Sequence, residues 1–559
     1  MRVLRYEIAV LNSTLQVTNF GRCLIFGVIF ICGFVTLFGL LIKSRNGTDK
    51  ESGNESLAIT EGLGENQNNS ATREIIIGVE YVMPGMAKKL SDLGIQAAKQ
   101  FPDSIRWDNM QSSAKSKINF SKTDRYVEEF QNAGFKTLVL ALRSRSLWAS
   151  KDFLLDHSPK SEYLDDYGNW IQVVVERYDK DGMNDMPGLK YPVIYYEIGT
   201  EFSSYEPEST QNYLEMLATA YKVAHTAYSD VKILHAAFLT SNVFKSYSTE
   251  LAYSNLNEIE KHFKENEALL KKHAKPLAEN RKVLDRSDIF DVVNFHSLGN
   301  PEEIEGNVRW LELEMKKRGI FKPIIISDTG ISPFVGLGPA TSCKGKQVAI
   351  LFPPANNNDR CRLAEYFKKL INKDSDSLEW VRGFAGIDVV KRVVIAADQG
   401  VTLIDTVWAE ELPLAQAALF QAASGNNGWG GMTKTNINVF TEQRTIVEIY
   451  PSFYALKQLQ AFIKGYTQIS RIQTRDTNVR IYELIINKKK KWIAWYESGK
   501  LLLPEDKSST VQFQLTVDSD KTVENVITKQ NQTNARKQKI KVAGGKVSIT
   551  LTDNPLYIY

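Results

Sequence analysis

The sequence predicts a (β/α)8 barrel, preceded by one membrane-spanning helix and followed by an antiparallel β-sandwich. Strand-like and helix-like segments alternate over residues 73–464, and short strand-like segments without helices between them fill residues 465–559. An apolar segment without charged residues occupies residues 23–42. With 559 residues, the chain is long enough for two or three domains.

The apolar segment 23–42 is long enough to cross a bilayer. A cleaved signal peptide would have a shorter apolar region near its start. We therefore expect an uncleaved anchor after an N-terminal tail, residues 1–22. Residues 43–72 are rich in Asn, Gly, Ser and Glu and predict a flexible tether. Basic residues flank the segment on both sides, so the positive-inside signal is weak. Acidic residues of the tether favour a single-pass membrane protein with its main body extracytoplasmic: Asp49, Glu51 and Glu55.

The composition argues against several function classes. The net charge is +4, from 69 basic and 65 acidic residues, which does not support a nucleic-acid partner. No zinc-ligand spacing, phosphate-binding glycine loop or Ser-His-Asp motif is present, so we expect no metal and no cofactor. Of the four cysteines, Cys343 and Cys361 flank one loop; they form either a disulfide or two free thiols.

Eight segments are rich in β-branched and aromatic residues and predict the barrel strands: 75–79, 103–107, 136–142, 192–198, 231–238, 290–296, 323–327 and 401–408. Helical periodicity lies between them at 123–134, 170–179, 210–228 and 307–319. Residues 246–286 form an overlong connection, which predicts either an extended outer helix or a lid over the barrel mouth. The sandwich strands are expected at 479–486, 491–497, 510–517, 539–544 and 546–552.

Two acids follow predicted barrel strands. Glu201 lies just past the fourth strand, and Asp328 lies past the seventh. Catalytic groups of such barrels occur at the C-terminal strand ends, and strands four and seven face each other across the mouth. Two facing carboxylates are the minimum equipment for glycoside hydrolysis. A separation of about 5 Å indicates a retaining nucleophile, whereas roughly 6.5–9.5 Å leaves room for the water of an inverting enzyme.

The order of these segments resembles the clan A glycoside hydrolases, the (β/α)8 superfamily that includes β-xylosidases, cellulases and mannanases. The segments that carry the resemblance are 118–150, 176–202, 288–298, 322–330, 401–408 and 449–465. The resemblance implies that Glu201 is the acid/base and Asp328 the nucleophile, with Arg106 steadying Asp328. The other expected substrate-binding residues are Trp148, Tyr196, Thr200, His296 and Trp408.

Three positions depart from the family pattern. Thr200 replaces the usual Asn before the acid/base, Asp328 replaces a Glu, and Leu298 replaces a Tyr. The Asp carboxylate is one methylene shorter and retreats by about 1.5 Å. We therefore expect a glycoside hydrolase of a β-linked oligo- or polysaccharide and leave open whether Asp328 attacks carbon or activates water. A glycan-binding protein without activity and a transglycosylase are the alternatives. Glu80 and Glu410 are reserve carboxylates, or salt-bridged rim residues.

Overall fold

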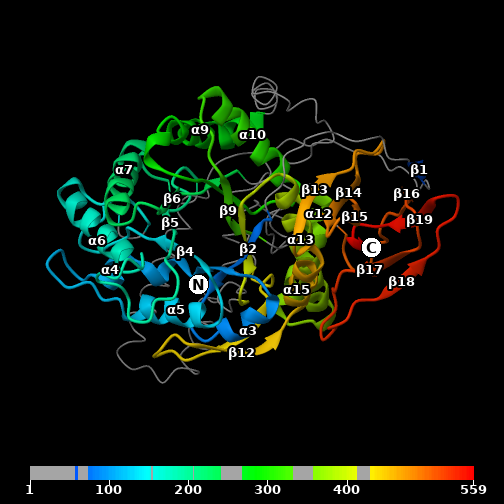
Figure 1. Ribbon diagram of the computed structural model, residues 1–559, viewed down its shortest axis with the longest axis horizontal. Helices are drawn as coiled ribbons and strands as arrows, with labels where there is room; N and C mark the ends of the chain where they lie inside the picture. The colour runs from blue at the N-terminus through cyan, green and yellow to red at the C-terminus, as the bar shows by residue number, and fades with distance from the viewer. Residues whose placement is uncertain are drawn as a thin grey trace. The chain divides into compact units, whose positions relative to one another are not determined.

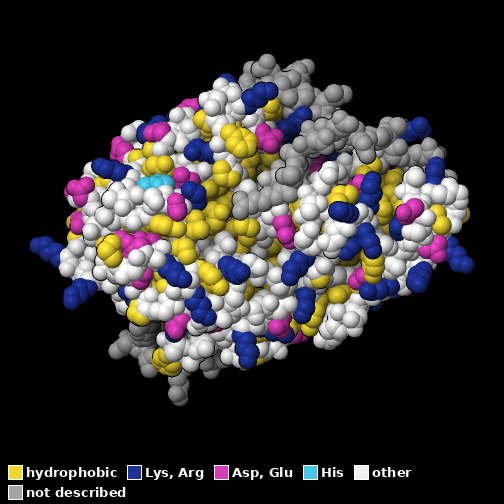
Figure 2. Space-filling view, viewed as in Figure 1, with side chains coloured by type: hydrophobic (Ala, Val, Ile, Leu, Met, Phe, Trp, Pro, Cys, Tyr) yellow, Lys and Arg dark blue, Asp and Glu magenta, His cyan; other side chains and the backbone are white. Residues whose placement is uncertain are grey.

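The computed structural model describes residues 57–60, 74–152, 155–204, 207–240, 267–330, 357–411, 428–500 and 502–559. All of them belong to one unit, residues 56–559. The expected anchor at 23–42 lies outside these ranges, and within them no helix has both the length and the apolar character needed to cross a membrane. Basic and acidic side chains are interspersed over the visible face, and hydrophobic side chains gather over the barrel (Figure 2).

The described residues contain a parallel sheet with strand order β6-β5-β4-β3-β2-β10-β9-β8-β7 (Figure 1). A parallel bridge between Leu234 and Val292 joins the two ends of this order and closes the barrel. Because only two residues separate β6 from β7, the two form one interrupted fifth strand. The strands are β2 (Ile76–Val82), β3 (Ala97–Gln100), β4 (Thr137–Leu142), β5 (Tyr195–Ile198), β6 (Lys232–His235), β7 (Phe238–Leu239), β8 (Val293–Ser297), β9 (Ile324–Thr329) and β10 (Leu403–Trp408). The predicted barrel is confirmed.

The prediction of the second strand was wrong. The strand expected at 103–107 lies instead at β3, and the predicted residues fall in a 3-10 helix (Pro102–Ile105) and in α4 (Trp107–Met110). The sequence of β3, AAKQ, has weak strand propensity and carries a lysine. Lys99 is nevertheless buried, because it pairs with acids that other strands place in the barrel interior. A local sequence pattern does not reveal this pairing of Lys99 with acids from other strands.

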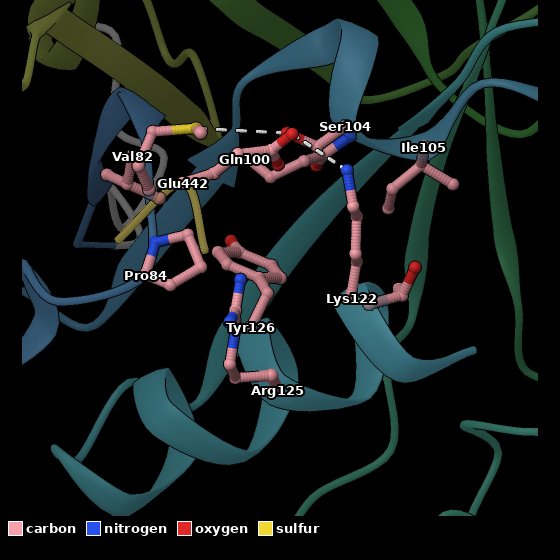
Figure 3. Close-up of a pocket in the computed structure, with 11 residues that line it drawn as sticks. Val82, Pro84, Gln100, Ser104, Ile105, Lys122, Arg125, Tyr126 and Glu442 are labelled. Atoms are coloured by element: carbon pink, nitrogen blue, oxygen red, sulfur yellow. Dashed lines mark hydrogen bonds and ion pairs between the residues drawn. The ribbon is translucent and has the colours of Figure 1, made fainter. Parts of the chain in front are cut away.

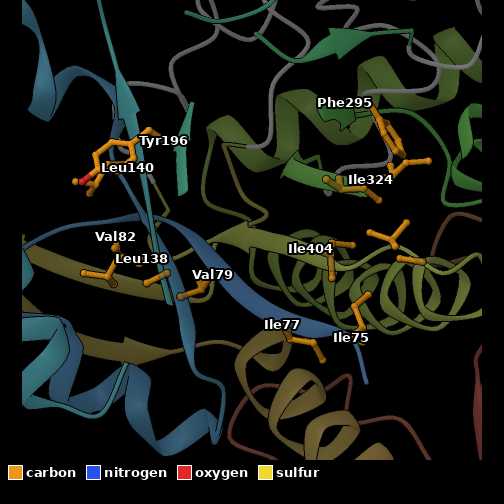
Figure 4. Packing of buried hydrophobic residues seen from close by; sticks show 14 of the residues in the cluster. Ile75, Ile77, Val79, Val82, Leu138, Leu140, Tyr196, Phe295, Ile324 and Ile404 are labelled. Carbon is orange, nitrogen blue, oxygen red and sulfur yellow. The ribbon is translucent and has the colours of Figure 1, made fainter. Parts of the chain in front are cut away.

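Helices surround the barrel and pack on its outer face. Figure 4 shows part of the hydrophobic cluster between the two layers, including Ile77, Val79, Leu140 and Phe295. Besides α4, the described helices are α3 (Ala87–Leu90), α5 (Ser121–Asn132), α6 (Leu164–Glu176), α7 (Thr210–Ala227), α9 (Glu267–Leu284), α10 (Glu303–Lys317), α12 (Asn357–Ile371), α13 (Ser375–Asp398) and α15 (Pro451–Ile463). Because α9 contacts α7 and α10, the described part of the long connection is an outer helix rather than a lid.

The β-sandwich follows α15 and is also confirmed. Its six-stranded sheet contains β13 (Tyr466–Arg471), β14 (Val479–Ile486), β15 (Lys489–Tyr496), β17 (Lys521–Asn525), β18 (Lys537–Ile540) and β20 (Leu556–Ile558). One face of this sheet packs on the smaller sheet, and the other shares a hydrophobic core with α13 and α15, which lie between barrel and sandwich (Figure 1). The smaller sheet contains β1 (Leu57–Thr60), β16 (Val511–Thr516) and β19 (Lys546–Leu551).

Two features of the termini and loops differ from or extend the expectations. β1 lies within the predicted tether and pairs in parallel with β16, so the tether prediction was wrong for these four residues. Cys361, on α12, is disulfide-bonded. Its expected partner, Cys343, lies outside the described residues.

Candidate active site

Side chains inside the barrel form layers that follow from strand alternation. The lowest layer is apolar, with one residue from each strand position: Ile76, Ala97, Val139, Tyr195, Leu234, Val292, Ile325 and Leu403. Because residues i and i+2 face the same side of a strand, the next layer is found two positions further along. That layer is polar and contains Lys99, Glu197, Asn294, Ser327 and Asp405, all buried. An apolar floor therefore supports a buried polar layer beneath the C-terminal strand ends.

Lys99 is the cation at the centre of this polar layer. Its Nζ lies 2.8 Å from Glu197 Oε2 and 3.2 Å from Glu80 Oε1, and it donates a 2.8 Å hydrogen bond to the Ser327 carbonyl. Burial lowers the pKa of Lys99, but the negative charge of Glu197 is the largest of several effects that together outweigh burial and raise it overall. Burial by itself would raise the pKa of Glu197, but the positive charges of Lys99 and His296 lower it below its ordinary value. Lys99 and Glu197 are therefore a buried ion pair.

Two further carboxyls in the interior are held neutral. Burial and then the charge of Asp328 raise the pKa of Glu80 well above its ordinary value, against the opposing effect of Lys99. Burial raises the pKa of Asp405 in the same way, and Lys99 offsets only part of that effect. A Cβ on Gly78 would lie 2.1 Å from Asp405 Oδ1, so only glycine fits beside this carboxyl. Lys99 is thus the cation shared by several carboxyls, and those whose burial it does not fully offset keep their protons.

Glu201 is positioned by a histidine of β8, two strand positions away around the barrel. Glu201 Oε1 lies 2.6 Å from His296 Nδ1, and His296 Nε2 lies 3.1 Å from Ser327 Oγ. All three side chains are buried. Glu201 follows β5 with φ of 41°, a left-handed conformation that costs a residue with a Cβ about 1–3 kcal/mol. A glutamate held in strained backbone at a strand end is typical of a functional position.

Asp328 is held from the side of the first strand. In the register of β8 and β9, Asp328 is the partner of His296. Tyr81 donates a 3.4 Å hydrogen bond to Asp328 Oδ2, and Glu80 lies near enough that, after burial, the charge of Asp328 raises the pKa of Glu80. Burial, followed by the charge of Asp328, raises the pKa of Tyr81, so its phenol keeps the proton that it donates.

Glu201 and Asp328 therefore belong to one cluster. His296 contacts Glu201 and pairs in register with Asp328, and both carboxylates raise the pKa of Tyr81. Trp408, at the end of β10, packs edge-on against the Tyr81 ring with centroids 4.8 Å apart. The structure brings together Glu201, Asp328, His296 and Trp408 at the C-terminal strand ends, where the sequence predicted a site.

Arg106 does not take its expected place beside Asp328. Its Nε donates a 2.5 Å hydrogen bond to Asp108, and its Nη2 donates one of 3.1 Å to Asn109. This follows from the wrong prediction of the second strand, because Arg106 lies beyond the 3-10 helix that follows β3 and not at the end of a strand. The cation next to the acids is Lys99, from β3 itself.

Tyr196 is also wrong as a substrate-binding residue. It precedes the inward-facing Glu197 on β5, so alternation turns it to the outside of the barrel. There it is completely buried in the hydrophobic cluster of Figure 4. Burial, and then Asp179 in the loop before β5, raises the pKa of its phenol. Tyr196 is a core residue.

The positions of Trp148 and Thr200 do not decide whether these residues bind a substrate. Trp148 donates a hydrogen bond to the Gln111 carbonyl and packs edge-on against Trp107 and Tyr163, which makes it part of an aromatic cluster. Thr200 is buried next to Glu201 at the strand end, as expected from its sequence position. A substrate contact for either residue stays a prediction.

The two reserve carboxylates, Glu80 and Glu410, lie in different surroundings. Glu410 pairs with Arg444 at 3.0 Å and accepts a hydrogen bond from Thr435, which is the salt-bridged alternative. Glu80 is not a rim residue: it is fully buried between Lys99 and Asp328.

A small pocket lies beside the cluster rather than in it. Figure 3 shows it lined by Gln100, Lys122, Tyr126 and Glu442, with an ion pair of 2.8 Å between Lys122 Nζ and Glu442 Oε1. None of the expected site residues lines this pocket.

The sequence did not reveal Lys99, Glu197, Tyr81 or Asp405 as members of the cluster. A signal was present for two of them, because a charged residue inside an otherwise apolar strand is costly unless it is paired. Glu197 in YYEI and Asp405 in LIDTVW carry that signal. The partner of each could be named only once the strands were placed around the barrel.

No protein-family model and no curated protein matches the sequence. Solved structures do match. A family 39 glycoside hydrolase from the gut symbiont Bacteroides cellulosilyticus WH2 aligns with a TM-score of 0.53 and 10% identity, over 87% of this chain and 82% of that one. The chain has the fold of a clan A glycoside hydrolase. A monomeric β-xylosidase from Caulobacter crescentus CB15 aligns with a TM-score of 0.47 and 12% identity, over 88% of this chain and 97% of that one.

Such low identity shows the clan A fold alone. Because this fold hosts many reactions, the chemistry has to be argued from the side chains at the strand ends.

Proposed function

We propose that this protein hydrolyses a β-linked glycan, with Glu201 and Asp328 as its two catalytic carboxylates. One observation carries the proposal: two buried carboxylates at the ends of β5 and β9 belong to one cluster, joined through His296 and Tyr81. The expected anchor at 23–42 would hold the barrel at a membrane, with its main body on the extracytoplasmic side.

Glu201 acts as general acid in this mechanism. It donates a proton to the oxygen of the leaving sugar, while the contact with His296 fixes the orientation of its carboxyl group. His296 is fixed in turn by Ser327 and lies 3.8 Å from Glu197, whose charge is balanced by Lys99. The ion pair of the polar layer thereby supports the acid from below.

Asp328 is the second carboxylate. The hydrogen bond from Tyr81 sets its direction, and Glu80 lies beside it. As a nucleophile, Asp328 bonds to the anomeric carbon, and water later releases the sugar with retention. As a base, it takes a proton from a water that attacks the carbon, and the configuration inverts. A sugar acceptor in place of water would make the same site a transglycosylase.

The test is hydrolysis of a panel of aryl glycosides by the full chain, purified in detergent. Wild type is compared with Glu201→Gln, Asp328→Asn and Asp328→Glu, and with Glu128→Gln, which removes an exposed carboxylate on α5. We expect both amide variants at the site to lose at least about a hundredfold in kcat/KM, and Glu128→Gln to retain wild-type activity. Glu201→Gln should lose less on substrates with strongly acidic leaving groups, which need little protonation.

The released anomer, followed by NMR, assigns the role of Asp328. Retention identifies a nucleophile, and inversion identifies a base. An inactive wild type with activity appearing in Asp328→Glu would overturn the proposal and favour a glycan-binding protein, because the shorter side chain then fails to reach the substrate.

A further inference from the structure

The loop between α6 and β5 contains three aspartates that converge. Asp179, Asp181 and Asp185 lie within the sequence DKDGMND, residues 179–185. Each offers a carboxylate oxygen, and these oxygens all lie within 4.8 Å of one another. Because the loop precedes β5, it lies at the N-terminal end of the barrel strands, away from the catalytic cluster at their C-terminal ends.

Asp179 is the buried member of this group. Its side chain is only 4% exposed, and its Oδ2 has no hydrogen-bond partner. The other oxygen, Oδ1, accepts a 3.2 Å bond from the Asp181 backbone N–H. A buried carboxylate oxygen aimed into a cluster of acids needs a positive partner.

The basic side chains nearby are engaged elsewhere. Lys180 Nζ donates to the Lys190 carbonyl and lies over the Tyr191 ring. The Arg177 guanidinium pairs with Asp124, with 2.7 Å between Nη2 and Oδ2, and its Nη1 donates to the backbone carbonyls of Asn184 and Asp185 rather than to a carboxylate of the loop. Among the ion pairs of the described residues, none includes an aspartate of this loop. No carboxylate of the cluster is therefore in a direct ion pair with a described residue, and Arg177 acts on Asp185 only from a distance.

We propose that this loop binds a calcium ion through Asp179, Asp181 and Asp185. Calcium takes oxygen ligands at about 2.3–2.6 Å, so two oxygens on one ion are separated by at most about 5 Å, which the cluster satisfies. The set contains no His or Cys, which zinc would favour. Backbone N–H groups of Lys180 and Gly182 donate to the two oxygens of Asp185, at 3.0 and 2.9 Å, and fix its direction. Each of these oxygens keeps a lone pair for the ion.

The ion would neutralise Asp179 and fix the loop that leads into β5, the strand that carries Glu197 and precedes Glu201. This site revises the sequence-based expectation of no metal. It does not depend on the proposed hydrolysis, because it lies at the other end of the strand and its ligands are not part of the catalytic cluster.

The test is the thermal unfolding of the full chain, stripped with EDTA and then supplied with CaCl2 or MgCl2. At about 10 mM, ten times the weakest affinity of extracellular calcium modules, we expect CaCl2 to raise Tm by about 1–3 °C and MgCl2 to do less. Asp181→Asn should abolish the rise, since it removes an exposed ligand charge while its amide oxygen can still accept the bond from Met183. Glu128→Gln, which removes a carboxylate elsewhere, should keep the full rise.

A second variant separates ion binding from damage to the fold. Asp179→Asn removes the buried charge without changing the size of the side chain. We expect it to be more stable than wild type in EDTA at pH 7.5 and to lose its response to calcium. No calcium response in wild type, an equal response to magnesium, or an undiminished response in Asp181→Asn would each overturn the assignment.

Discussion

Replacement of Lys99 by methionine tests the charge balance of the barrel interior. Methionine fills a similar volume but removes the cation that lies 2.8 Å from Glu197 and 3.2 Å from Glu80. The change also removes the donor to the Ser327 carbonyl. Because Glu80 is already neutral, the main loss is the partner of the ionised Glu197.

The expected cost follows from the burial of this pair. Both side chains are 2% exposed, so water cannot replace the missing partner. Breaking a buried ion pair by removal of one member costs about 3–5 kcal/mol. In a protein of this size, we expect Tm to fall by about 3–5 °C, measured by differential scanning calorimetry. The double variant Lys99→Met/Glu197→Gln should recover a large part of that loss, since no unpaired charge remains.

The pH dependence gives a sharper readout. In wild type, the lowered pKa of Glu197 contributes stability that is present above its unfolded value and is lost as the pH falls. Without Lys99, burial raises the pKa of Glu197 above its unfolded value, and the contribution is lost as the pH rises. The variant should therefore recover stability, relative to wild type, between pH 7 and 5. A stability within about 1 kcal/mol of wild type, with an unchanged pH profile, would refute the buried-pair interpretation.

Three other changes test separate parts of the structure. Burial raises the pKa of Asp398 to about 6, so its protonated form contributes stability that is complete below the unfolded pKa and is lost as the pH rises through 6. Asp398→Asn should flatten the calorimetric pH profile between pH 4 and 7 by on the order of 2 kcal/mol, and an unchanged profile would contradict this. Tyr81→Phe removes a hydrogen bond to Asp328 and should lower kcat about 2- to 10-fold without unfolding the chain; equal kcat would remove Tyr81 from the site. Gly78→Ala places a methyl group against Asp405 and should cost about 1–3 kcal/mol in thermal unfolding, whereas wild-type stability would show that the carboxyl can move away.

Local sequence patterns were sufficient for most of the barrel. The strands around Val139, Ile325 and Ile404 are apolar runs, because strands of a parallel barrel are buried on both faces. The prediction of the second strand was wrong for the opposite reason. Ala97–Gln100 contains little that marks a strand, and the acids that pair with its lysine are far away in the sequence.

The candidate site shows the same division. The positions of Glu201 and Asp328 could be predicted, since each acid lies at or just past the C-terminal end of an apolar strand of a recognisable barrel. Their neighbours could not be predicted, because Arg106 and Tyr196 satisfy the local pattern as well as Lys99 and Glu197 do. The choice between them depends on which way each side chain points.

The sequence by itself therefore determined the barrel, the sandwich and the two acids at the strand ends, because these depend on apolar periodicity and on residues adjacent in the chain. Only the tertiary structure decided that Lys99 rather than Arg106 is the interior cation and that Glu80 keeps its proton beside Asp328. The same holds for the three aspartates that converge before β5. Charge compensation acts through space over a few ångströms in a medium of low dielectric constant, so its partners are set by the fold and not by their order along the chain.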